Sequence, residues 1–282
     1  MTLLFAQLKW ELHKLFSRRR TYLGFAAFLI FELIILFLIR RDDVRSIIRK
    51  AIERAGYPFA ENFTGPTVAN LVLSYTITVL GGFYLALVGG DIVAQEIEEG
   101  TMRMVLVHRV SRARILFVKV LACFAYTATL SVFIAVTSLI LGIAFEGTGH
   151  LFVVTVDQRA AATYDLWNGL LVYFFGALPL LTLSMLTVTS AAFMLSCFKI
   201  KPAVATIGAL SFFLCDQLLY ELPFLAPVRH WFLTGRLSSW CYIYTPHVPS
   251  ALLWKNYSTL LALDALAIAI GFWRFHRRDL KP

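Results

Sequence analysis

The sequence predicts an all-α integral membrane protein that crosses the bilayer with six helices and forms a single domain over residues 1–282. Two features of composition predict this class: hydrophobic residues make up 59% of the 282 positions, and charged residues only 15%. Soluble proteins average roughly half apolar and about a quarter charged residues. A chain this apolar needs lipid to cover the surface that a soluble fold would expose to water.

Residues 1–20 predict an amphipathic helix that lies on the membrane before the first span. Apolar residues recur there at helical spacing, at Leu4, Leu8, Leu12 and Leu15. Trp10 and the run Arg18–Arg20 are typical of the headgroup region, where indole rings and basic side chains gather. We therefore expect this helix at the cytoplasmic interface.

Six apolar segments are long enough to cross a bilayer, which takes about 20 helical residues. They are residues 21–39, 68–90, 115–145, 166–197, 203–222 and 258–273. The third and fourth exceed one crossing, so we expect them to tilt, kink or project, with Pro179 as the kink point in the fourth. An even number of spans predicts that both termini lie on one side.

The distribution of basic residues indicates that this side is the cytoplasm, because Lys and Arg are more numerous on its connecting segments. The first outer loop runs against this rule, with Arg40, Arg41, Arg45, Arg49, Lys50 and Arg54. Apolar residues repeat at three and four positions within the loop and predict a second interfacial helix. This helix either rests on the outer leaflet or gates an exit path.

The segment from Pro223 to Tyr257 is rich in Trp, Tyr and Pro. Aromatic side chains of this kind prefer the membrane interface. A pair of short re-entrant helices fits the composition, provided that the interrupted backbone is buried in protein. We expect this segment on the outer side, directly before the last span.

Several function classes lack support in the sequence. The formal charge of +9 arises from short basic clusters between apolar stretches, a pattern that fits a membrane surface and excludes nucleic acid as the expected partner. The phosphate-binding pattern GxxxxGK[ST], HExxH and GxSxG are all absent from the sequence. The histidines are scattered and the four cysteines have no CxxC spacing, so no metal site is predicted. We therefore expect a protein that is not itself an enzyme.

The loop between the second and third spans carries an ordered charge pattern. In chain order its members are Glu96, Glu98, Glu99, Gly100, Thr101, Arg103, Ser111, Arg112 and Lys119. Exposed carboxylates followed by basic residues present both signs of charge to a partner. Gly100 supplies a left-handed position, after which Thr101 is placed to cap a new helix. We expect all three carboxylates to be exposed.

This order of residues resembles the signature loop of type-two ABC export permeases, the ABC-2 family. Weaker resemblance covers the whole chain, although Arg109 stands where the family often has proline two residues before Ser111. The resemblance implies an exporter permease in the bacterial inner membrane, with the loop as a coupling helix that docks on a separate ATP-binding-cassette subunit. It also implies a permease homodimer surrounded by membrane lipid. ATP and Mg would bind to the partner, and this chain would bind no cofactor.

Three acidic residues near or within the spans are candidates for a substrate path: Glu32, Asp216 and Asp264. Intramembrane ionisable residues often mark transport paths, but hydrogen bonding between helices also explains them. An alternative function is an ion-coupled secondary transporter or channel, in which these carboxyls bind protons or cations. A membrane-embedded enzyme or assembly factor is a second alternative, without a nucleophile or metal constellation behind it. The substrate itself is not identified, although an aromatic-lined path would suit hydrophobic or amphipathic molecules.

Overall fold

The computed structural model describes residues 2–102, 111–154 and 161–277. Its elements are α1 (Thr2–Phe16), α2 (Arg19–Arg40), α3 (Asp42–Arg54), α4 (Phe59–Asn62), α5 (Gly65–Thr76), η1 (Ile77–Gly81), α6 (Gly82–Glu98), α8 (Arg112–Glu146), β1 (Leu151–Val154), β2 (Ala161–Tyr164), α9 (Leu166–Leu171), η2 (Val172–Ala177), α10 (Leu178–Ser196), α11 (Pro202–Glu221), η3 (Pro223–Trp231), α12 (Leu233–Leu237), η4 (Ser238–Tyr244) and α13 (Ser250–His276).

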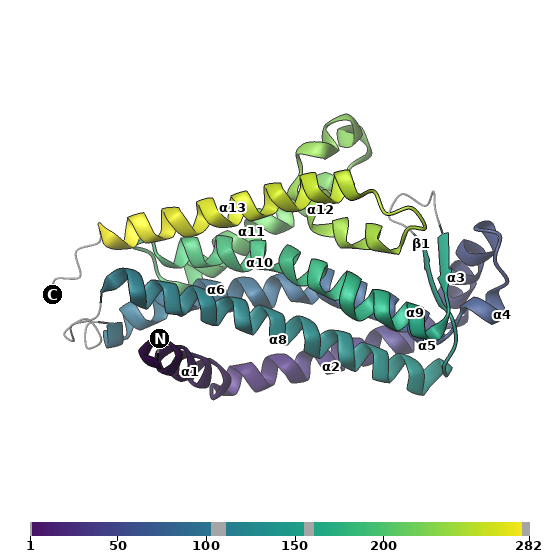
Figure 1. Ribbon diagram of the computed structural model, residues 1–282, viewed down its shortest axis with the longest axis horizontal. Helices are drawn as coiled ribbons and strands as arrows, with labels where there is room; N and C mark the ends of the chain where they lie inside the picture. Colours follow the sequence, from purple (N-terminus) through teal and green to yellow (C-terminus); the bar gives the residue numbers. More distant parts are fainter. Residues whose placement is uncertain (1, 103–110, 155–160, 278–282) are drawn as a thin grey trace.

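Six helical stretches among the described residues are long and apolar enough to cross a membrane, which confirms the predicted fold class. They are α2, the continuous stretch α5–η1–α6, α8, the continuous stretch α9–η2–α10, α11 and α13. These helices run side by side along one long axis (Figure 1). The protein is therefore a multi-pass membrane protein.

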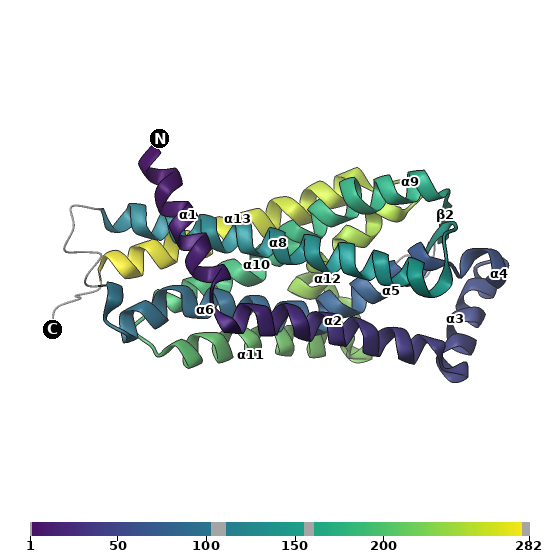
Figure 2. The same cartoon turned by 90° about the horizontal axis from the view of Figure 1, so that it is seen from below.

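The two ends of the bundle differ in what they carry. The terminal end, as we call it, holds both termini, α1, the end of α6 and the start of α8 (Figure 1). The hairpin end holds α3, α4 and the antiparallel pair of β1 and β2, in which Leu151 faces Tyr164. Figure 2 shows that α1 crosses the bundle at an angle, whereas α2 runs along it.

The centre of the bundle is built from α6, α8 and α10, which contact one another and contribute most of the buried core. Backbones approach closely where glycine leaves room. A Cβ atom on Gly65 of α5 would lie 2.2 Å from the carbonyl oxygen of Gly147, just beyond α8. Small residues at such crossings let membrane helices pack without large cavities.

Two spans contain π-helical turns. One is η2, which ends directly before Leu178 and Pro179, the expected kink point of the fourth span. Proline has no backbone N–H to donate to the preceding turn, and a widened turn accommodates that loss. The other is η1, which is followed by Gly82 at the start of α6.

Two helices extend well beyond the predicted spans. The helix α6 continues to Glu98, past the predicted span end at residue 90, and partners on other helices neutralise Asp91 and Glu96. The last helix begins at Ser250, not at residue 258, and includes the polar residue Asn256, whose amide donates to Ser239 Oγ at 2.8 Å. Apolar content therefore underestimates the length of a helix whose polar residues find partners elsewhere in the chain.

The segments outside the spans also form helices. The helix expected in the first outer loop is α3, which buries Ile52 against the bundle. The segment after α11 forms η3, α12 and η4, short helices that pack against α10, α11 and α13. Apolar periodicity did not predict the strand pair of β1 and β2, which are only four residues long each.

Candidate functional site

The second span ends in an exposed acidic turn at the terminal end. Glu98 and Glu99 are exposed, as the sequence predicted. Gly100 has a φ of +75°, a left-handed conformation that terminates α6 and favours glycine. The Thr101 hydroxyl donates to the carbonyl oxygen of Glu96 at 3.2 Å and so satisfies one of the last carbonyls of the helix.

Glu96 is buried, so the expectation that it is exposed was wrong. Only 4% of the residue is accessible. Its Oε1 atom lies 2.8 Å from Nζ of Lys119 and also pairs with Lys14 of α1. Lys119, itself 2% exposed, lies 2.7 Å from Glu11 of α1 and donates to the carbonyl oxygen of Ile92 at 3.2 Å. We call Glu11, Lys14, Glu96 and Lys119 the buried charge cluster.

The buried charge cluster joins three elements at their terminal ends. Glu11 and Lys14 come from α1, Glu96 from the last turn of α6, and Lys119 from the third turn of α8. Alternating signs place each positive group beside a carboxylate, which offsets the desolvation of Glu96 and Lys119, the two almost fully buried members. The end of α6 and the start of α8 are therefore both tied to α1.

The far side of the loop is fixed by a helix cap. Ser111 precedes α8, and its hydroxyl accepts a hydrogen bond from the backbone N–H of Arg114 at 3.3 Å. Arg112 donates to the carbonyl oxygen of His276, which links the start of α8 to the end of α13. Arg103, another residue of the predicted site, lies outside the described residues.

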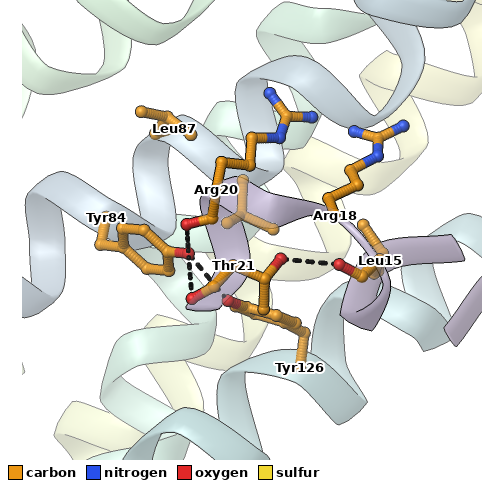
Figure 3. A pocket seen from close by; sticks show the side chains of 8 residues that line it. Leu15, Arg18, Arg20, Thr21, Tyr84, Leu87 and Tyr126 are labelled. Atoms are coloured by element: carbon orange, nitrogen blue, oxygen red, sulfur yellow. Dashed lines mark hydrogen bonds between the residues drawn. The ribbon is translucent and has the colours of Figure 1, made fainter. Parts of the chain in front are cut away.

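A second polar contact ties the junction of α1 and α2 to α6. Arg20 pairs with Asp91 and donates to Gln95 Oε1 at 2.6 Å, and Arg18 donates to the same oxygen at 3.0 Å. The Tyr84 hydroxyl lies 3.2 Å from the carbonyl oxygen of Arg20, to which it donates. Figure 3 shows both guanidinium groups pointing the same way above Tyr84.

The small cavity beside this junction has room for about one water molecule. Its volume is about 10 Å³, and Leu15, Arg18, Arg20, Thr21, Tyr84, Leu87, Val88 and Tyr126 line it (Figure 3). Ligand pockets for small molecules are usually at least about 300 Å³. The cavity therefore belongs to the packing of the junction and not to a substrate site.

The three acidic residues proposed for a substrate path have separate environments. Glu32 is fully buried in α2 and accepts a hydrogen bond from the Thr137 hydroxyl at 3.0 Å. Asp216 accepts hydrogen bonds from the backbone N–H groups of Leu233 and Thr234, at 3.1 and 2.7 Å, and thereby caps α12. Asp264, 5% exposed, faces α10. The structure does not bring these three carboxyls into one site.

The geometry gives little support to the alternative functions. Asp216 caps α12, so its carboxylate is already engaged and does not support an ion path through all three carboxyls. Within residues 2–102, 111–154 and 161–277, no group of three His, Cys, Asp or Glu side chains is placed to hold a metal ion. No disulfide bond joins the four cysteines, all of which lie among the described residues.

Sequence reasoning missed Glu11 and Lys14 as members of the site, and it did not identify the partners of Lys119. Glu11 and Lys14 are three residues apart and therefore share one helix face, which was the available signal. We interpreted them as the polar face of an interfacial helix. Lys119 entered the argument through the resemblance, without a partner.

One comparison with known families gives a match over most of the chain. A family model described as "ABC-2 family transporter protein" matches residues 8–280, which is nearly the whole chain. A search of curated proteins found no match.

Proposed function

This chain belongs to the ABC-2 family of transporter proteins, and on that premise we propose that it couples ATP hydrolysis on a separate subunit to export. Membership makes it a permease subunit, the membrane component of an ABC transporter. The finer proposal concerns how the two subunits are coupled. ATP and Mg bind to the partner in this scheme, because this chain has no phosphate-binding GxxxxGK[ST] motif.

One observation carries the proposal: the exposed carboxylates Glu98 and Glu99 lie next to Glu96, a member of the buried charge cluster. Glu98 and Glu99 are accessible to a partner, and two residues before Glu98 the side chain of Glu96 is locked to Lys119 and Lys14. A push on the exposed turn is therefore transmitted to α1, α6 and α8 together. Coupling requires an element of this kind, whose position ATP binding on the partner biases between two arrangements.

The proposal requires the terminal end to face the cytoplasm. The excess of Lys and Arg on the connections at this end supports that orientation. Cysteines introduced at Glu98 and at Glu53 of α3 report the orientation through labelling by a membrane-impermeant maleimide in whole cells. We expect labelling at position 53 and none at position 98. Labelling of position 98 from outside would refute the coupling role.

Charge reversal at the exposed turn tests docking. We expect Glu98→Lys with Glu99→Lys to lower co-purification of the ATP-binding subunit at least about tenfold, which corresponds to about 1.4 kcal/mol, and to abolish ATP-dependent transport. Glu53→Lys, at an exposed position on α3 at the hairpin end, is the matched control and should leave both unchanged. Equal recovery of the ATP-binding subunit from all three proteins would contradict the proposal.

We further propose that the permease acts as a homodimer and that α11 contributes to its interface. Only 11% of the apolar window of α11 is buried within the chain, the smallest share among the six candidate spans. Large apolar side chains such as Ile207, Phe212 and Leu218 are exposed on it. The exposed thiol of Cys215 on the same helix is a natural cross-linking probe. Oxidative cross-linking in membranes should give a dimer that Cys215→Ser abolishes; a monomer under all conditions would place α11 against lipid.

The exported substrate is proposed to be hydrophobic or amphipathic. The apolar surfaces of the spans support this class, since they include exposed aromatic residues such as Phe37, Tyr75 and Phe175. ATP-dependent uptake into inside-out vesicles, measured with a panel of lipids, amphipathic peptides and hydrophobic dyes, tests it. Uptake of none of these classes, with uptake of a small polar solute instead, would overturn it.

A further inference from the structure

The contact between α10 and α13 contains a buried carboxyl near the middle of α13. The two helices run in the same direction, with Tyr257 beside Ser184 at 3.3 Å and Gly271 beside Cys197. Asp264 lies seven residues from Tyr257 and seven from Gly271, which is about 10 Å along the helix from each. Its side chain is therefore far from both surfaces of the membrane.

The hydroxyl groups of α10 fall into two sets. Thr182, Ser184, Thr189 and Ser196 donate to backbone carbonyl oxygens or bond to a neighbouring hydroxyl. Thr187 and Ser190 make no side-chain hydrogen bond to the residues that the structure describes, although both are buried. Hydroxyls within helices ordinarily bond back to the preceding turn. Both instead interact with the Asp264 carboxyl, but outside ordinary hydrogen-bond geometry.

Asp264 has the same unsatisfied character. Its Oδ1 atom makes no hydrogen bond to any described residue, and none of the ion pairs between described residues includes it. Unsatisfied polar atoms in a membrane interior are costly, and an isolated carboxylate is more so. Three such oxygens from two packed helices therefore point to a shared ligand that carries positive charge.

We propose that Asp264, Thr187 and Ser190 bind a hard monovalent cation between α10 and α13, with Na⁺ as the probe. Carboxylate and hydroxyl oxygens are the donors that hard cations prefer. A single carboxylate is neutralised by one positive charge, which favours a monovalent over a divalent ion. A cation coordinates all three oxygens at once, whereas a proton on the carboxyl joins it to one acceptor.

Glu32 provides the internal comparison. It is also a buried carboxyl in a span, but it accepts a hydrogen bond from Thr137 and so has one oxygen satisfied within the protein. Its Oε2 atom, like Asp264 Oδ1, makes no hydrogen bond to a described residue, but the hydroxyl beside Glu32 is that of Thr137, which is already bonded. Glu32→Gln is therefore the matched control for the loss of a buried carboxyl.

Equilibrium binding of radioactive sodium to the full-length chain in lipid nanodiscs tests the site. We expect saturable binding of one Na⁺ per chain and a higher unfolding temperature in NaCl than in choline chloride. Asp264→Asn should abolish both effects, and Glu32→Gln should preserve them. Thr187→Val and Ser190→Ala keep the side-chain volume nearly unchanged and should weaken binding about tenfold or more.

Two results would overturn the proposal. The first is the absence of saturable sodium binding by the wild-type chain, which would leave a proton or a water molecule as the ligand. The second is undiminished binding in both hydroxyl variants, which remains decisive if Asp264→Asn does not fold. The site does not depend on docking by residues 96–112, so its failure leaves the proposed function intact.

Discussion

At the terminal end of the bundle Lys14 and Lys119 pair with carboxylates, whereas at the hairpin end Arg45 and Arg49 lie over aromatic rings. Lys119 and Glu96 are almost fully buried as a pair. Arg45 and Arg49 of α3 lie over the Phe59 ring, with guanidinium carbons 5.7 and 4.9 Å from its centroid, and Arg49 is exposed. Buried pairs fix helices relative to one another, while exposed cation–π contacts hold a surface helix weakly. The comparison teaches that the terminal end is built to move as a unit.

Replacing Lys119 should have the largest effect on stability of the substitutions that test this difference between the two ends. Lys119→Met leaves Glu11 and Glu96 buried without their shared partner, and breaking a buried pair typically costs about 3–5 kcal/mol. At about 2–4 °C for each kcal/mol in a protein of this size, the unfolding temperature should fall by roughly 6–20 °C. Thermal unfolding of the detergent-purified chain measures it.

Lys255→Met is the control for this loss of charge. Lys255 is exposed on α13, and we expect its replacement to change the unfolding temperature by less than about 2 °C, as most surface substitutions do. Equal effects of the two variants would mean that the buried charge cluster does not fix α1 to the bundle.

The buried charge cluster also shows which features could not be predicted from the sequence. Apolar length predicted the six spans because lipid imposes that length on each helix locally. The exposure of Glu98 and Glu99 followed from their position at the end of a span. Burial of Glu96 could not be predicted, because its partner Lys14 lies 82 residues away and only folding brings them together.

The role of Asp216 likewise depends on partners that are distant in the sequence. Its replacement is expected to have the second-largest effect. Its carboxylate accepts three hydrogen bonds from α12, two from backbone N–H groups and one from the Thr234 hydroxyl at 2.7 Å. Asp216→Ala should cost about 1–2 kcal/mol, the upper range for a lost helix cap. Hydrogen exchange at residues 233–237 should become faster while exchange in α10 is unchanged.

Asp165→Ala is the matched control, since Asp165 stands at the N-cap of α9 but makes no capping hydrogen bond with its side chain. We expect exchange in α9 to be nearly unaffected. If Asp216→Ala also left hydrogen exchange in the following helix unchanged, the carboxyl of Asp216 would have no capping role. Asp216 would then again be a candidate for the ion-coupled alternative.

The smallest effect is expected at the hairpin end, where Arg45→Ala removes contacts with two rings and with Glu146. The guanidinium lies 5.7 and 5.1 Å from the centroids of Phe59 and Phe63, and 3.9 Å from the Glu146 carboxylate. Exposed contacts of this kind contribute about 0.5–1 kcal/mol each at most. The variant should therefore lower the unfolding temperature by only a few degrees, as measured in the same detergent assay. A loss as large as that of Lys119→Met would show that both ends are equally rigid, and the distinction between them would fail.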